Sequence, residues 1–212
     1  MKIQTAEFLV GAASSAQFPS LVLPEVAFAG KSNVGKSSLI NFLLNRKGLV
    51  KTSGVPGKTR QLNFFLINGR FRLVDLPGYG FSRAPKQEQA NWVSLVESYL
   101  RNRPGLRGVV LILDVRHDPG PNDRMMKDWL EYFRVPYLAV ANKIDKVSKG
   151  RLPARLAELA KTLGLPQKPL PCAARSRQGG GELWLRLQEW LGQEDLRQAP
   201  ASPGRRAGPG RR

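Results

Sequence analysis

The chain has 212 residues, of which 42% are hydrophobic, and a formal net charge of +18 at pH 7. This length fits one domain with an additional tail, and the apolar content is sufficient for a sizeable core. No apolar run approaches the roughly 20 residues that span a membrane as a helix, and residues 1–10 lack the pattern of a secretory signal. Because Cys172 is the single cysteine, no disulfide can form within the chain, and a cytoplasmic location is expected.

The charge balance indicates a polyanionic partner. A sequence pI near 10.8 is typical of proteins that bind nucleic acid or an anionic membrane face. Binding to a membrane surface would need a basic amphipathic helix with an exposed apolar stripe, and the sequence offers none beyond those a core requires. Nucleic acid is therefore the favoured partner, although the same charge could serve solubility alone.

Residues 1–23 are expected to form a lead-in strand or loop, and the main domain is expected to cover residues 24–194. The short apolar run 26–29 predicts a buried strand, and residues 38–44 predict a helix. Residues 30–37, between them, fit the pattern Gly-x-x-x-x-Gly-Lys-Ser, whose backbone N–H groups bind phosphate oxygens. The predicted triphosphate loop (P-loop) consists of Gly30, Lys31, Ser32, Asn33, Val34, Gly35, Lys36 and Ser37.

Within this loop, two side chains have specific expected roles. Lys36 should reach the β- and γ-phosphates and act in catalysis, and the Ser37 hydroxyl should ligate Mg²⁺. A polar, glycine-rich stretch follows at residues 47–61, and a loop of this length in a compact domain is usually functional.

Residues 62–67 and 71–74 are apolar runs separated by Asn68 and Gly69, a pair that predicts a tight β-hairpin. The second run ends in Asp75, Leu76, Pro77 and Gly78. An Asp-x-x-Gly motif at a strand end, about 40 residues after a P-loop, is typical of the γ-phosphate end of a nucleotide site. We expect Asp75 to hold a Mg²⁺-bound water and the Gly78 N–H to meet the γ-phosphate.

The rest of the chain alternates helical stripes with buried strands at 109–113 and 136–141. The stripes are formed by Trp92, Leu95, Val96, Tyr99 and Leu100; by Met125, Met126, Trp129, Leu130 and Phe133; by Leu152, Leu156, Leu159 and Leu163; and by Leu183, Trp184, Leu187, Trp190 and Leu191. This alternation predicts an α/β three-layer sandwich of the P-loop NTPase type. Its sheet should be mainly parallel with one antiparallel edge strand, with helices on both faces and ligands at the carboxyl ends of the strands.

Asn142, Lys143, Ile144 and Asp145 follow the strand at 136–141 and indicate selection of guanine. The Asp145 carboxylate can accept hydrogens from guanine N1 and N2, which adenine does not offer. Asn142 should tie this turn to the P-loop, and the Lys143 stem should lie along the base. A backbone N–H for guanine O6 is expected among Cys172, Ala173 and Ala174, with Ala174 as the candidate.

Residues 195–212 are expected to form a disordered basic tail, because they are rich in Arg, Gly and Pro. His117, the single histidine, receives no role.

Together these motifs resemble the translation-factor-related GTPases and, more narrowly, the EngB/YsxC family of bacterial ribosome-biogenesis GTP-binding proteins. The resemblance is carried by residues 28–41, by the run Gly57, Lys58, Thr59, Arg60 and Gln61, and by residues 75–80. It implies a GTPase that binds GTP, GDP and Mg²⁺, aids assembly of the large ribosomal subunit on its rRNA, and is needed for cell division and septation. It also implies that Thr59 ligates Mg²⁺ beside Ser37 and acts in catalysis. Ala173 departs from the family pattern, where serine is usual, as does the basic tail.

Tyr79 stands where many switch GTPases place a glutamine that orients the attacking water, so slow intrinsic hydrolysis is expected. Asn33 resembles the asparagine of potassium-activated GTPases and could help catalysis by holding K⁺, or it could merely brace the loop. Two other functions remain open: a polyanion-binding module with a vestigial pocket, and a metabolic P-loop kinase. We expect a monomer that does not bind membranes.

Overall fold

The computed structural model describes residues 2–50, 61–80 and 85–192. Within this part of the chain, seven strands form one sheet in the order β1-β3-β4-β2-β5-β6-β7. The strands are β1 (Ala6–Ala12), β2 (Glu25–Gly30), β3 (Leu62–Ile67), β4 (Phe71–Asp75), β5 (Leu106–Asp114), β6 (Tyr137–Asn142) and β7 (Leu170–Pro171). The helices are α1 (Lys36–Leu44), α2 (Lys86–Asn102), α3 (Pro121–Tyr132), α4 (Leu152–Leu163) and α5 (Gly180–Leu191), with short 3-10 turns η1 (Ser15–Gln17) and η2 (Ile144–Lys146).

The sheet is mainly parallel, which confirms the predicted fold class. Strands β4, β2, β5, β6 and β7 pair in parallel, whereas β3 runs antiparallel to both β4 and β1. The antiparallel strand lies one position in from the edge, because residues 6–12 add β1 to its outer side. The segment expected to lead into the nucleotide domain is therefore part of the same sheet, and we propose that the domain starts with β1.

The predicted hairpin between β3 and β4 is confirmed, with left-handed backbone at both turn residues, Asn68 (φ 50°) and Gly69 (φ 66°). The Asn68 side chain also accepts the Gln4 and Thr5 N–H groups at 2.7 and 3.0 Å and donates to the Lys2 carbonyl at 3.0 Å. This one side chain therefore fixes the N-terminal segment to the hairpin.

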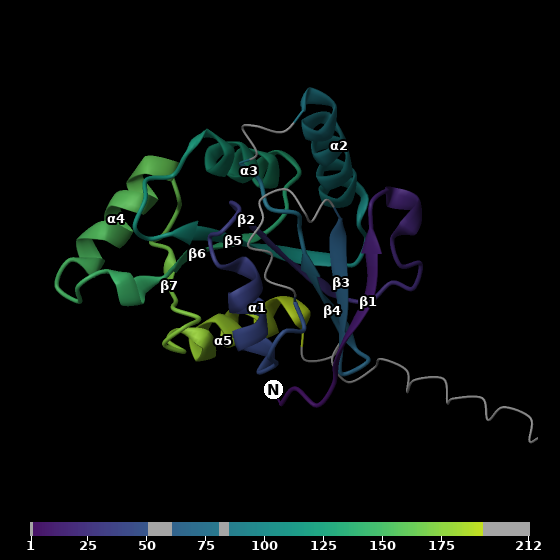
Figure 1. Ribbon diagram of the computed structural model, residues 1–212, viewed down its shortest axis with the longest axis horizontal. Helices are drawn as coiled ribbons and strands as arrows, with labels where there is room; N and C mark the ends of the chain where they lie inside the picture. The colour runs from purple at the N-terminus through teal and green to yellow at the C-terminus, as the bar shows by residue number, and fades with distance from the viewer. Residues whose placement is uncertain (1, 51–60, 81–84, 193–212) are drawn as a thin grey trace, which may run out of the picture.

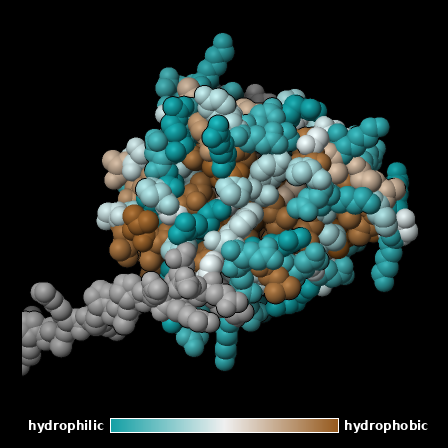
Figure 2. All heavy atoms as spheres, turned by 180° about the vertical axis from the view of Figure 1, so that it is seen from behind, coloured by the Kyte–Doolittle hydropathy of each residue, from teal (hydrophilic) through white to brown (hydrophobic). Residues whose placement is uncertain are grey.

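Helices cover both faces of the sheet (Figure 1). Alternate residues of β2 face opposite sides: Val26 and Phe28 pack with α1 and α5, whereas Ala27 and Ala29 pack with α2 and α3. This alternation is the consequence of a two-residue side-chain period in a strand that is buried on both sides. Among the described residues, no helix is both long and apolar enough to cross a membrane. Seen from behind, the molecule shows mostly hydrophilic side chains, with hydrophobic ones interspersed (Figure 2).

A buried ionic cluster lies at the start of β2. Glu25 is fully buried and accepts hydrogen bonds from Arg72 at 2.8 Å, from Tyr99 at 3.1 Å, and from Arg103 at 2.8 and 2.5 Å. Two guanidinium groups and a phenol thus offset the cost of removing this carboxylate from water. The cluster joins β2, β4 and the end of α2. It lies at the amino ends of these parallel strands, whereas the predicted site lies at their carboxyl ends.

We expect Glu25→Gln to lower the free energy of unfolding by about 3 kcal/mol or more, because it leaves buried arginines without their counter-charge. Urea unfolding measures this. Glu97→Gln is the matched control: Glu97 pairs with Arg101 on the exposed face of α2, so its loss should cost about 0.5 kcal/mol or less. Similar losses for both variants would contradict the assignment of Glu25 as a structural centre.

Candidate nucleotide-binding site

The predicted motifs lie together at one end of the sheet, where the parallel strands have their carboxyl ends. Strand β2 ends at Gly30, β4 at Asp75, β5 at Asp114, β6 at Asn142 and β7 at Pro171. Because these strands are parallel neighbours, the residues that follow them lie side by side.

The P-loop runs from the end of β2 into α1 and turns through two left-handed residues, Asn33 (φ 65°) and Gly35 (φ 96°). At Gly35 a side chain is excluded by space as well, since a Cβ there would lie 2.5 Å from Nδ2 of Asn142. The turn delivers the chain to the N-terminus of α1 at Lys36, where free backbone N–H groups and the helix dipole favour an anion.

Lys36 and Asp75 form an ion pair between the P-loop and the end of β4. Asp75 is 3% exposed, so the ammonium group compensates a carboxylate that is almost out of water. Ser37 lies half-buried in the first turn of α1. A hydroxyl and a carboxylate near phosphate oxygens are the ligands that Mg²⁺ prefers, so the residues present fit a magnesium–triphosphate complex.

Asn142 and Lys143 bind the P-loop from the other side. Nδ2 of Asn142 donates to the Val34 carbonyl at 3.0 Å, and Nζ of Lys143 donates to the Asn33 carbonyl at 2.7 Å. The contact expected between Asn142 and the P-loop is thus present. Within the described residues, Oδ1 of Asn142 is buried without a donor, a cost of about 1–3 kcal/mol that a ligand could relieve.

Asp114, at the end of β5, was missed by sequence reasoning. It accepts hydrogen bonds from Lys143 Nζ at 2.8 Å and from Arg116 Nε and Nη2 at 2.9 and 2.7 Å. Burial opposes its charge, but the bonds from Arg116 and Lys143 outweigh burial and hold the pKa of Asp114 well below its usual value. Asp114 therefore stays ionised, and its carboxylate fixes the position of the Lys143 ammonium group. The available signal was an acid directly after the apolar run 109–113, the same pattern that identified Asp75.

Asp145 lies in η2, with 18% of its side chain exposed and a carboxylate oxygen 3.9 Å from Lys146 Nζ. The segment of Cys172 and Ala173 lies against this turn, because the Ile144 N–H donates to the Cys172 carbonyl at 3.2 Å. The N–H groups of Cys172 and Ala173 already donate to Ala141 and Gln178, so Ala174 stays our candidate for a base contact. Burial, with a contribution from Glu182, raises the pKa of Cys172 to about 12, so this thiol is a small apolar group here.

Four of the expected site residues, Gly57, Lys58, Thr59 and Arg60, lie outside the described residues, so their roles stay predictions. Gln61 is described and lies exposed just before β3. His117 borders a cavity of about 210 Å³ between the P-loop and the loop after β5.

Tyr79 does not resemble a water-orienting group. It is 2% exposed, packs in the core cluster between the sheet and helices α2 and α3, and donates its phenol to Asp123 at 2.8 Å. Burial, followed by the charge and hydrogen bond of Asp123, raises the pKa of Tyr79 well above its usual value. An engaged, buried phenol supports the expectation of slow intrinsic hydrolysis.

Comparison with known proteins agrees with this geometry. Residues 25–143 match the family model of the 50S ribosome-binding GTPases. The chain is 49% identical over 191 residues to the probable GTP-binding protein EngB of Syntrophomonas wolfei, covering 90% of this chain and 99% of that protein. The chain belongs to the EngB family of GTP-binding proteins. The probable GTP-binding protein EngB of Geobacter metallireducens is 47% identical over 202 residues, covering 94% of this chain and 99% of that protein.

Solved structures share the fold. A crystal structure of a probable EngB protein has a TM-score of 0.66 at 24% identity and covers 79% of this chain and 98% of its own. Aquifex aeolicus Era bound to GDP·AlF4⁻ has a TM-score of 0.62 at 23% identity, over 82% of this chain and 58% of its own. As a member of the EngB family, the chain is a P-loop GTPase that binds guanine nucleotides.

Proposed function

We propose that this member of the EngB family is a cytoplasmic, monomeric GTP-driven switch in assembly of the large ribosomal subunit, needed for normal cell division and septation. The supporting observation is the P-loop itself, which contacts the Asp75 motif through Lys36 and the guanine motif through Asn142 and Lys143. The family model is also described by binding to the 50S ribosome.

In the proposed mechanism, the chain binds and orients GTP more than it activates water. Lys36 exchanges its partner Asp75 for the β- and γ-phosphates, and the Gly78 N–H meets the γ-phosphate. Mg²⁺, when bound by Ser37, Thr59 and a water on Asp75, supplies charge neutralisation. Asn33 would hold K⁺ against the phosphates, which turnover in KCl against NaCl tests directly.

Positive charge is unevenly distributed along the sequence. Residues 143–177 contain nine basic and two acidic residues, whereas residues 85–142 contain eight basic and seven acidic ones. Arg151 and Lys161 are exposed and border one groove on α4. Since phosphate contacts dominate the affinity of proteins for nucleic acid, we propose that this face of α4 contacts rRNA.

The test compares Arg151→Glu/Lys161→Glu with Lys86→Glu/Arg134→Glu, two exposed pairs with the same change of charge. We expect the α4 pair to weaken binding of the GTP-loaded protein to large-subunit precursors about 10-fold or more, and to lower the salt slope by about 2. The control pair should have a much smaller effect, and neither should change GTP hydrolysis. Equal losses in both pairs, or equal binding of the GTP and GDP forms, would favour a polyanion-binding module instead.

A further inference from the structure

Tyr79 follows the Asp-x-x-Gly motif and is fixed through its backbone, its phenol and its ring. Its N–H donates to the Gly30 carbonyl at 3.4 Å, and its carbonyl accepts the Ser32 N–H at 2.9 Å, so its backbone pairs with the P-loop. Its phenol donates to Asp123 of α3. Its ring meets Trp92 of α2 edge-on, with ring centroids 6.2 Å apart.

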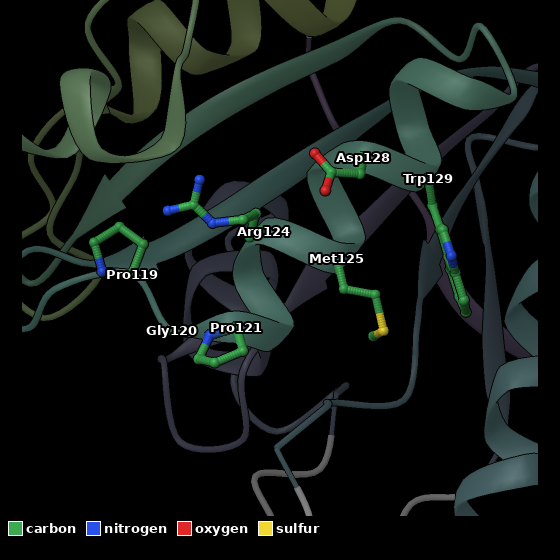
Figure 3. A pocket seen from close by; sticks show the side chains of 7 residues that line it. All are labelled: Pro119, Gly120, Pro121, Arg124, Met125, Asp128 and Trp129. Atoms are coloured by element: carbon green, nitrogen blue, oxygen red, sulfur yellow. The ribbon is translucent and has the colours of Figure 1, made fainter.

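Pro77, which precedes Gly78, is also bonded to Trp92. Nε1 of Trp92 donates to the Pro77 carbonyl at 3.0 Å. The Trp92 ring stacks on Trp129 of α3, with centroids 5.9 Å apart and planes 20° from parallel. Trp129 and Met125 project from the same side of α3, beside an open groove (Figure 3). Two helices thus fix the ring that holds Pro77.

Asp123 is itself fixed. It is 7% exposed, and each of its carboxylate oxygens has a partner: one accepts the Tyr79 phenol and the other accepts the Gly120 N–H at 2.8 Å, at the start of α3. The carboxylate that accepts the Tyr79 phenol is therefore fixed at the start of α3.

We propose that Tyr79 and Trp92 are positioning residues, which hold the Gly78 N–H beside the P-loop so that it is ready for the γ-phosphate of GTP. The inference rests on the proposed contact between Gly78 and that phosphate. A donor that is already fixed loses little conformational entropy when it binds, so its partner is bound more tightly. GDP has no γ-phosphate and gains nothing from this arrangement. The two residues therefore favour GTP over GDP and support hydrolysis, although neither is among the residues expected to contact the nucleotide.

The experiment compares Tyr79→Phe with Tyr99→Phe. Both remove a phenol that is buried and bonded to a carboxylate, but Tyr99 binds Glu25 at the opposite edge of the sheet. Affinities for GDP and for a non-hydrolysable GTP analogue, with single-turnover hydrolysis, are measured for each. We expect Tyr79→Phe to weaken binding of the analogue about 5-fold or more, to leave GDP binding within about 2-fold, and to slow hydrolysis. Tyr99→Phe should leave the ratio of the two affinities unchanged.

Trp92→Phe provides a second route if Tyr79→Phe does not fold, because it removes the donor to Pro77 and should give the same selective loss. Equal changes in GDP and analogue affinity, or no change in either variant, would overturn the proposal. Gly78→Ala separates the two claims. Its Cβ would lie 3.0 Å from Ser32 Oγ and 3.3 Å from the Ser32 backbone N, so it should push the residue 78 N–H away from the P-loop. If this variant weakens the analogue while Tyr79→Phe and Trp92→Phe do not, the positioning role alone fails. If it has no effect, the contact between Gly78 and the γ-phosphate fails.

Discussion

Replacing Asp145 by asparagine is expected to lower the affinity for GDP about 100-fold or more and to create affinity for xanthine diphosphate. The carboxylate accepts hydrogens from guanine N1 and N2, and charge-assisted bonds of this kind contribute about 1.5–3 kcal/mol each. An asparagine side chain offers one acceptor and one donor. Xanthine carries a carbonyl at C2 in place of the amino group, so it matches asparagine where guanine does not.

Calorimetric titration with GDP and XDP measures this exchange without interference from hydrolysis. Asp128→Asn is the matched control, because Asp128 is an exposed carboxylate on α3, away from the P-loop contacts. It should keep the wild-type preference for GDP. If Asp145→Asn still binds GDP as tightly as the wild type, Asp145 does not read the base.

The second large effect is expected at Lys36, where Lys36→Met should slow GTP hydrolysis about 10²- to 10³-fold. The ammonium group lies between the P-loop and Asp75, where it is expected to meet the β- and γ-phosphates, and loss of one such preorganised charge typically has this effect. The same substitution leaves Asp75 buried without its cation, so it should also lower the free energy of unfolding by about 3 kcal/mol.

A double variant tests the effect on stability. Lys36→Met/Asp75→Asn removes both charges, so urea unfolding should show most of the lost stability restored. Single-turnover hydrolysis should stay slow, because Lys36 and Asp75 both belong to the proposed nucleotide site. Recovery of hydrolysis together with stability would show that Lys36 matters only for folding. Normal hydrolysis by Lys36→Met alone would exclude it from the chemistry.

The parts of the site that sequence reasoning could predict are those written in short, contiguous motifs. The P-loop and Asp75 each combine a fixed sequence pattern with a strand end, so their role and position could be predicted. Asp114 and Tyr79 were different. Their partners, Lys143 and Asp123, lie 29 and 44 residues away in the sequence, and no local spacing relates such pairs. Only the packing of β5 beside β6, and of α3 beside the end of β4, brings them together.

The edge strand was hard to predict for a related reason. In β1 most residues are exposed or half-buried, so residues 6–12 carry little of the alternation that identifies a strand. Its register, with Ala6 opposite Ile67, depends on a partner that comes about 60 residues later and on Asn68, which fixes residues 2–5.

Selection of guanine is expected at the end of the sheet where the P-loop meets Asn142, Lys143 and Asp145. Isothermal titration of the wild-type chain with GTP and ATP analogues in the presence of Mg²⁺ tests this directly. We expect the guanine analogue to bind at least about 100-fold more tightly than the adenine one. Equal affinities for the two, or binding of neither, would contradict it.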